Sequence, residues 1–235
     1  MTVRAARTAP AVRERDIVMA REGAVLEGRL RVPLFPIGLV VLAQGGSGDR
    51  HNPRHRFAAD LLAGHRLATL SIELLTATER RDRAAIFEVE RLGRRLAGVL
   101  RRLPVVPETR HLPVGLFGTG SMAPAALWAA AEPETGVGAI AVRGGRPDLA
   151  GERLARIVAP TLLLVGGTDP RVRAGNLHVA DSLGGAVRTT ELTAPGRSSR
   201  AGQLSWRAAY SAAVWFTEQM TDAAQPARSI AGRRR

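Results

Sequence analysis

Short apolar runs alternate along the chain with segments whose apolar residues have helical spacing. Residues 37–43 are a continuous apolar run, the pattern of a strand buried on both faces of a parallel sheet, and residues 67–72 are expected to form another buried strand. Further strands are expected at residues 114–117, 137–142, 160–165 and 187–192. Ahead of them, residues 16–20 and 25–32 flank Gly23 and predict an N-terminal antiparallel hairpin.

Helices are predicted between these strands. Residues 54–64 carry Phe57, Leu61 and Leu62 at helical spacing and end at a glycine, a residue that commonly follows the last helical turn. Further helices are expected at residues 86–103, 172–183 and 204–220. Strands that alternate with helices indicate a mostly parallel central sheet with helices on both faces. The predicted fold class is therefore α/β.

One domain accounts for this pattern. The chain has 235 residues, of which 45% are hydrophobic, enough for a sizeable core, and no internal repeat divides it. We expect a single domain over residues 16–220. The Arg-rich ends, residues 1–15 and 221–235, are expected to be flexible.

The charge of the chain is strongly positive, with a formal net value of +13. All basic residues other than histidine are arginines scattered along the sequence, and aromatic residues make up 4%, too few for platforms that stack bases. Nucleic acid is therefore not the expected partner.

Composition also limits cofactors and compartment. The sequence has no cysteine, so neither a disulfide framework nor a thiolate metal site is expected, and no metal or other cofactor is predicted. No apolar run reaches the roughly 18 residues of a membrane span, and the N-terminus lacks the apolar core of a secretory signal. We expect a cytoplasmic protein without a membrane partner.

The most informative stretch is residues 114–126, where a short strand crosses two glycines and enters an Ala-rich helix. A strand-to-helix turn of this kind is the nucleophile elbow, G-x-S-x-G, which exposes its central residue above the sheet. Here the frame is Gly118-Thr119-Gly120-Ser121-Met122. Gly120 holds the nucleophile position, and the serine follows one residue later.

The chain resembles the α/β-hydrolase fold, specifically its dienelactone-hydrolase-like branch, over roughly residues 16–220. The resemblance is carried by residues 40–48, the elbow, residues 143–149 and residues 160–169. It implies that Asp169, followed by Pro170, is the triad acid.

The same resemblance shows where this chain departs from the family. The family has its nucleophile at the position of Gly120, its base histidine at Ser199, and a His-Gly pair at Gln44-Gly45. The triad positions are Gly120, Asp169 and Ser199, so two of the three triad members are missing and the triad is degenerate. Ser121 is either a shifted nucleophile or an N-cap of the following helix. Asp169 and Ser199 could likewise have structural roles, Asp169 as a helix cap or turn residue and Ser199 as a turn residue.

Several residues are candidates for binding a ligand at the carboxyl end of the sheet. The backbone N–H groups of Gly45, Gly46 and Ser121 could form an oxyanion-type pocket, and Gln44 either lines it or holds the loop. Basic residues border the same end and favour an anion, although a solvated cluster is the alternative: Arg50, His51, Arg54, Arg143 and Arg146.

Three functions remain open at this point. A serine hydroxyl is a poor nucleophile without an adjacent base. The first hypothesis is therefore a catalytically degenerate hydrolase, a pseudohydrolase that binds a small anionic ligand or a partner protein. The second is a lyase, isomerase or cyclase that reuses the pocket with Asp169. The third is an ester or lactone hydrolase with Ser121 as the shifted nucleophile.

Overall fold

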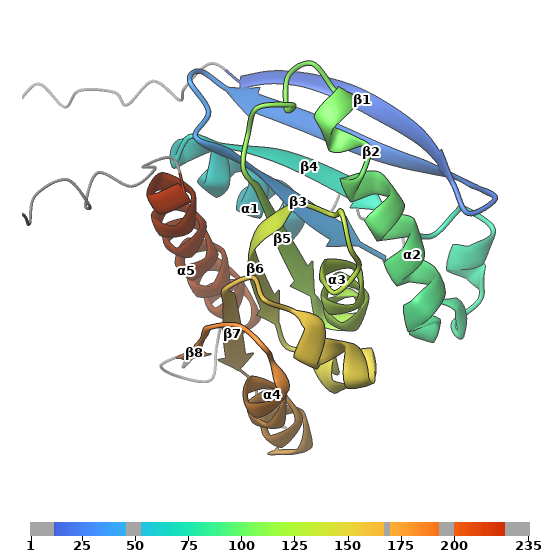
Figure 1. The fold of residues 1–235 in the computed structure, drawn as a ribbon, viewed down its shortest axis with the longest axis vertical. Helices are drawn as coiled ribbons and strands as arrows, with labels where there is room; N and C mark the ends of the chain where they lie inside the picture. The colour runs from blue at the N-terminus through green and yellow to red at the C-terminus, as the bar shows by residue number, and fades with distance from the viewer. Residues whose placement is uncertain (1–11, 46–52, 167–169, 193–199, 224–235) are drawn as a thin grey trace, which may run out of the picture.

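In a computed structural model, the chain forms one eight-stranded sheet between two layers of helices (Figure 1). The structure describes residues 12–45, 53–166, 170–192 and 200–223. The strands are β1 (Val12–Arg21), β2 (Ala24–Pro33), β3 (Gly38–Gln44), β4 (Leu67–Glu73), β5 (Val114–Thr119), β6 (Val137–Arg143), β7 (Thr161–Gly166) and β8 (Val187–Leu192).

The sheet is mostly parallel, as the sequence predicts. Its strand order is β1-β2-β4-β3-β5-β6-β7-β8, with β2 antiparallel to both neighbours and the pairs from β4 to β8 parallel. Every residue of β3 is buried, since it lies between β4 and β5 with helices on both sides. The strand that leads into the elbow, β5, lies inside the sheet, which confirms the predicted position.

Helices cover both faces of this sheet (Figure 1). On one face α1 (Pro53–Gly64) and α5 (Arg200–Ala223) pack against each other and against the strands. On the other face lie α2 (Val89–Leu100), α3 (Ala123–Ala130) and α4 (Pro170–Ser182). No helix in the described ranges is long and apolar enough to cross a membrane.

Several boundaries differ from the prediction. Strand β1 begins at Val12, inside the segment predicted to be flexible, because it pairs with β2 along its whole length and Arg15 forms an ion pair with Glu108. The predicted stripe of α1 is wrong at Phe57, which is 38% exposed, whereas Ala59 and Leu62 are buried. The buried face of α1 thus consists of Leu62, as predicted, with Ala59 and Ala63, while Phe57 lies at its edge.

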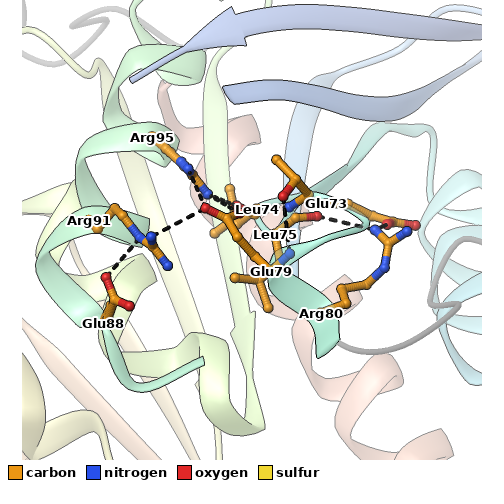
Figure 2. A network of polar contacts seen from close by, with 9 residues as sticks. Glu73, Leu74, Leu75, Glu79, Arg80, Glu88, Arg91 and Arg95 are labelled. Carbon is orange, nitrogen blue, oxygen red and sulfur yellow. Dashed lines mark hydrogen bonds and ion pairs between the residues drawn. The ribbon is translucent and has the colours of Figure 1, made fainter. Parts of the chain in front are cut away.

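An ion-pair network holds the connection between β4 and α2 (Figure 2). Both terminal nitrogens of Arg95 donate to the Glu79 carboxylate, at 2.7 and 2.8 Å, and one also donates to the carbonyl of Leu74 at 2.8 Å. These hydrogen bonds lower the pKa of Glu79 from 4.5 to about 2. The backbone N–H of Leu74 in turn donates to the carbonyl of Gln44, so the network supports the end of β3.

Candidate functional site

A pocket of about 490 Å³, called here the elbow pocket, lies at the carboxyl ends of the parallel strands. The ends of β5 to β8 form its floor, and α1 and α5 form its sides. Ligands of open α/β sheets bind at this edge of the strands. Its described lining includes His55, Thr119, Gly120, Arg143, Gly144, Gly145 and Ser205.

The backbone of a nucleophile elbow is retained, but its apex is Gly120. The chain passes from extended Thr119 into a 3-10 turn, Gly120–Met122, and then into α3. Gly120 has φ +55°, a left-handed conformation that side chains adopt rarely, and a Cβ there would meet nothing within 4 Å. The backbone at Gly120 therefore has the conformation that exposes a nucleophile to the pocket, but the residue has no side chain to supply one.

Tight packing around the apex depends on glycines. A Cβ at Gly118 would lie 2.6 Å from the Cβ of Ala126, so α3 approaches β5 closely there. A Cβ at Gly145 would lie 2.0 Å from the carbonyl oxygen of Gly120. Gly145 also has φ +75°. The segment after β6 thus abuts the elbow backbone and fixes one wall of the pocket.

The last glycine of the elbow motif is replaced by Met122, whose side chain is buried. A Cβ on Gly45 would lie 2.3 Å from the terminal methyl carbon of Met122. The methionine therefore occupies space that Gly45 leaves open, and the two residues fit as a pair. Gly45 lies under this side chain and is not among the described residues that line the elbow pocket.

Ser121 is exposed on the 3-10 turn and does not belong to the described lining of the pocket. Its hydroxyl has no recorded hydrogen bond to a base in the described part of the chain. The shifted-nucleophile hypothesis needs this serine to face a substrate and a base together. The described geometry provides neither arrangement.

The electrostatic character of the elbow pocket comes from Arg143. This half-buried side chain lines the pocket, and its Nη1 donates to the Ser205 hydroxyl at 3.3 Å. A guanidinium carries five N–H donors, so the Arg143 side chain can bind more than one acceptor at once. Among the described lining residues, Arg143 is the only one with a side chain that is permanently charged at neutral pH. The described wall therefore favours an anion.

Arg146, the other arginine predicted at this edge, lies outside the described lining of the pocket. Its side chain is 59% exposed and binds Asp148 through Nε and Nη2, with a shortest contact of 2.6 Å. These hydrogen bonds lower the pKa of Asp148. The sequence places the two arginines three residues apart, but only Arg143 faces the cavity.

Gln44 lies in a second, smaller cavity of about 100 Å³, called here the α1 cavity. It is enclosed by β2, the ends of β3 and β4, and α1, and His55 lines both cavities. Gln44 is 3% exposed, and its Oε1 has no hydrogen-bond partner among the described residues. The sequence predicts that Gln44 lines the pocket at the elbow or holds its loop; it is not among the described residues that line the elbow pocket, and it lines this cavity instead.

Several predicted site residues lie outside the described residues: Gly46, Arg50, His51, Asp169 and Ser199. Arg54 belongs to α1, but its side chain is also outside the description. His178 is exposed on α4, in agreement with the expectation that it does not face the elbow. Within the described ranges no group of three or more His, Cys, Asp or Glu side chains could hold a metal ion.

Sequence reasoning missed His55, Ser205 and Arg31. His55 could have been found from its spacing, because it precedes Ala59 by four residues and therefore shares the helix face that packs on the sheet. Ser205 is brought to the pocket only by the return of α5 across the sheet. Arg31 belongs to an alternating polar face of the hairpin that the sequence alone assigns to solvent.

The strand order and the strand-to-helix elbow define an α/β-hydrolase fold, and comparison with solved structures narrows the class. The chain is 35% identical to a dienelactone hydrolase from Anabaena variabilis, with a TM-score of 0.78, over 90% of this chain and 99% of that one. The chain therefore belongs to the dienelactone hydrolase family.

More distant structures share the fold alone. A cold-adapted esterase from an Arctic intertidal metagenomic library is 17% identical, with a TM-score of 0.63, over 88% of this chain and 94% of that one. A dienelactone hydrolase-like promiscuous phosphotriesterase from metagenomic libraries is 18% identical, with a TM-score of 0.62, over 89% and 99% of the two chains.

Two curated relatives come from two strains of Mycobacterium tuberculosis. Each is 43% identical over 181 residues, which is 77% of this chain. Their names give phosphoribosyl transferase as a provisional function. This chain spans 41% of the length of each relative. No protein-family model matches the chain.

Proposed function

We propose that this protein is a member of the dienelactone hydrolase family that binds a small anionic ligand in the elbow pocket and does not hydrolyse esters through an acyl-serine intermediate. The observation that carries the proposal is Gly120 at the apex of the elbow, where its backbone faces the pocket without a nucleophile. A partner protein is the second kind of ligand that such a scaffold could bind.

The groups that serine-type hydrolysis requires are missing from their expected positions. Acyl transfer needs a nucleophile, a base within hydrogen-bond reach and a group that orients the base. Gly120 supplies no nucleophile, and Ser121 is exposed beside the pocket. The family's base position holds Ser199, which cannot take up a proton at neutral pH as an imidazole does.

Charge supports an anion as the ligand. Arg143 brings a permanent positive charge to the pocket wall, and a guanidinium binds carboxylates and phosphates through paired hydrogen bonds. The name of the Mycobacterium tuberculosis relatives directs attention to phosphoribosyl compounds. Because this chain spans 41% of those proteins, we extend to it only the ligand chemistry and not the transferase reaction.

A non-hydrolytic enzyme is the second candidate, and His55 is the observation that favours it. This side chain lines the elbow pocket together with Arg143, so an acid–base group and an electrostatic group share one cavity. A lyase, isomerase or cyclase could use this pair without a nucleophile, with Asp169 as a further acid–base group. Product formation from a bound anion, lost in a His55→Ala variant, would distinguish it from a binding protein.

Replacing Arg143 with alanine is expected to weaken binding of inorganic phosphate and small organic phosphates at least tenfold, since a charge-assisted contact contributes about 1.5–3 kcal/mol. Isothermal titration calorimetry measures the change. The matched control is Arg146→Ala, which removes the same charge from the same segment but from a side chain paired with Asp148 outside the described pocket lining. Equal weakening in both variants would reduce the effect to overall charge and contradict the proposed site.

Turnover of activated esters and dienelactone-like lactones is expected to be the same in the wild type and in Ser121→Ala. A fluorophosphonate probe provides the direct measurement, because it labels activated serines covalently. We expect no stoichiometric labelling of Ser121. Labelling that disappears in Ser121→Ala would overturn the proposal and establish the shifted-serine hydrolase instead.

A further inference from the structure

The α1 cavity contains two buried polar groups that lack a partner among the described residues. Gln44 and Arg31 both line it, and Arg31 is 9% exposed. Neither Oε1 of Gln44 nor Nη1 of Arg31 has a hydrogen-bond partner there. A buried polar group without a partner costs about 1–3 kcal/mol, so such groups ordinarily bind water or a ligand.

The charge of Arg31 is already compensated within the protein. Its Nε donates to Glu14 at 2.8 Å and its Nη2 donates to Asp60 at 2.6 Å. The remaining nitrogen, Nη1, is still a hydrogen-bond donor, but the two carboxylates already balance the positive charge of the guanidinium. A second anion is disfavoured there, whereas a neutral acceptor is suitable.

A hydroxyl group matches this cavity because it accepts from a guanidinium and donates to an amide oxygen at the same time. It suits either orientation of the Gln44 amide, because a hydroxyl can donate to the amide oxygen or accept from the amide nitrogen. Ser71, opposite Arg29 in the sheet, adds a further hydroxyl to the lining. The volume of about 100 Å³ admits a small hydroxylated group but no large ring system.

His55 stands between this cavity and the elbow pocket, because it lines both. Ala58 lines the elbow pocket and the next residue, Ala59, lines the α1 cavity, so the two cavities adjoin the same turn of α1. A ligand held by Arg143 in the elbow pocket would have to pass His55 to reach Gln44 and Arg31.

We propose that the α1 cavity is a second subsite and that the ligand is a hydroxylated organic phosphate, with its phosphate in the elbow pocket and its hydroxyls between Gln44 and Arg31. This inference rests on the proposed anion site. The inference adds the requirement for hydroxyl groups and assigns their recognition to Gln44.

The test compares ribose 5-phosphate with pentyl phosphate, which has the same number of carbons and the same anionic group but no hydroxyls. Calorimetry on the wild type is expected to show ribose 5-phosphate binding at least about tenfold more tightly, as one or two additional hydrogen bonds produce. In Gln44→Leu this preference is expected to fall to about onefold. Leucine replaces a buried amide whose oxygen lacks a described partner, so the variant should unfold at a temperature no lower than the wild type.

The outcomes separate the two proposals. If both phosphates bind through Arg143 with equal affinity, or if Gln44→Leu keeps the preference for ribose 5-phosphate, the α1 cavity holds only water and this inference fails while the anion site stands. If neither phosphate binds, the proposed function fails. Ribose without phosphate serves as the third ligand, and tight binding of ribose to Arg143→Ala would overturn the placement of the phosphate.

Discussion

Replacing Glu79 with glutamine is expected to lower the free energy of unfolding by about 3 kcal/mol, because it leaves the guanidinium of Arg95 buried without its counter-charge. The Arg95 side chain is 4% exposed, and both of its terminal nitrogens bind the Glu79 carboxylate (Figure 2). Glutamine keeps the shape of the side chain but supplies one acceptor oxygen and no charge. Urea denaturation at neutral pH measures the loss.

The matched control is an ion pair on α2, the helix that carries Arg95. Glu90 binds Arg94 at 2.6 Å, but the two side chains are 61% and 55% exposed. Exposed pairs of this spacing contribute about 0.3–0.5 kcal/mol, so Glu90→Gln should be nearly neutral. Comparable losses in both variants would contradict the view that burial of Arg95 makes the network important.

The stabilisation by Glu79 is also expected to depend on pH. The hydrogen bonds from Arg95 lower the pKa of Glu79 from 4.5 to about 2. A depressed pKa contributes stability that is fully present above the unfolded value and is lost as pH falls through the folded value. The difference in unfolding free energy between the wild type and Glu79→Gln should therefore be constant above about pH 5 and shrink toward pH 2. A difference that does not change over this range would contradict the assignment.

Most of the sheet could be predicted from the sequence because its strands are buried on both faces. Residues 37–43 predict β3 to within one residue, since no polar residue interrupts a strand between two helical layers. The orientation of α1 could be predicted only in part, because Leu61 and Leu62 pack against the core as their spacing indicates whereas Phe57 does not. Phe57 is the largest apolar residue of that helix, yet the close approach of α1 to β4 and α5 favours the small side chains of Ala59 and Ala63 on the buried face.

The site could be predicted only where it depends on the backbone. The elbow and Gly120 follow from the local sequence, because two glycines between a strand and a helix leave few other turns. The separation of Arg143 from Arg146 could not be predicted, because it depends on which arginine finds Asp148 after the chain turns away from β6. Arg31 becomes a site residue only because α1 covers the polar face of β2, a contact between segments distant in the sequence.

Replacing Gly145 with alanine is expected to destabilise the protein by about 3 kcal/mol and to abolish phosphate binding in the elbow pocket. Two physical terms combine. A left-handed conformation costs a residue with a side chain about 1–2 kcal/mol, and Gly145 has φ +75°. The new Cβ would also lie 2.0 Å from the carbonyl oxygen of Gly120, a backbone atom that can move only if the elbow moves. Overpacking of this kind costs about 1–3 kcal/mol.

The neighbouring glycine separates these two terms. Gly144 has φ +58°, but a Cβ there would meet nothing within 4 Å. Gly144→Ala should therefore show only the backbone cost of about 1–2 kcal/mol and should still bind phosphate, whereas Gly145→Ala shows the additional displacement of the elbow. Thermal unfolding and calorimetry with phosphate measure both effects. If the two variants are equally stable and bind phosphate equally well, contact between the segment after β6 and the Gly120 carbonyl does not shape the pocket.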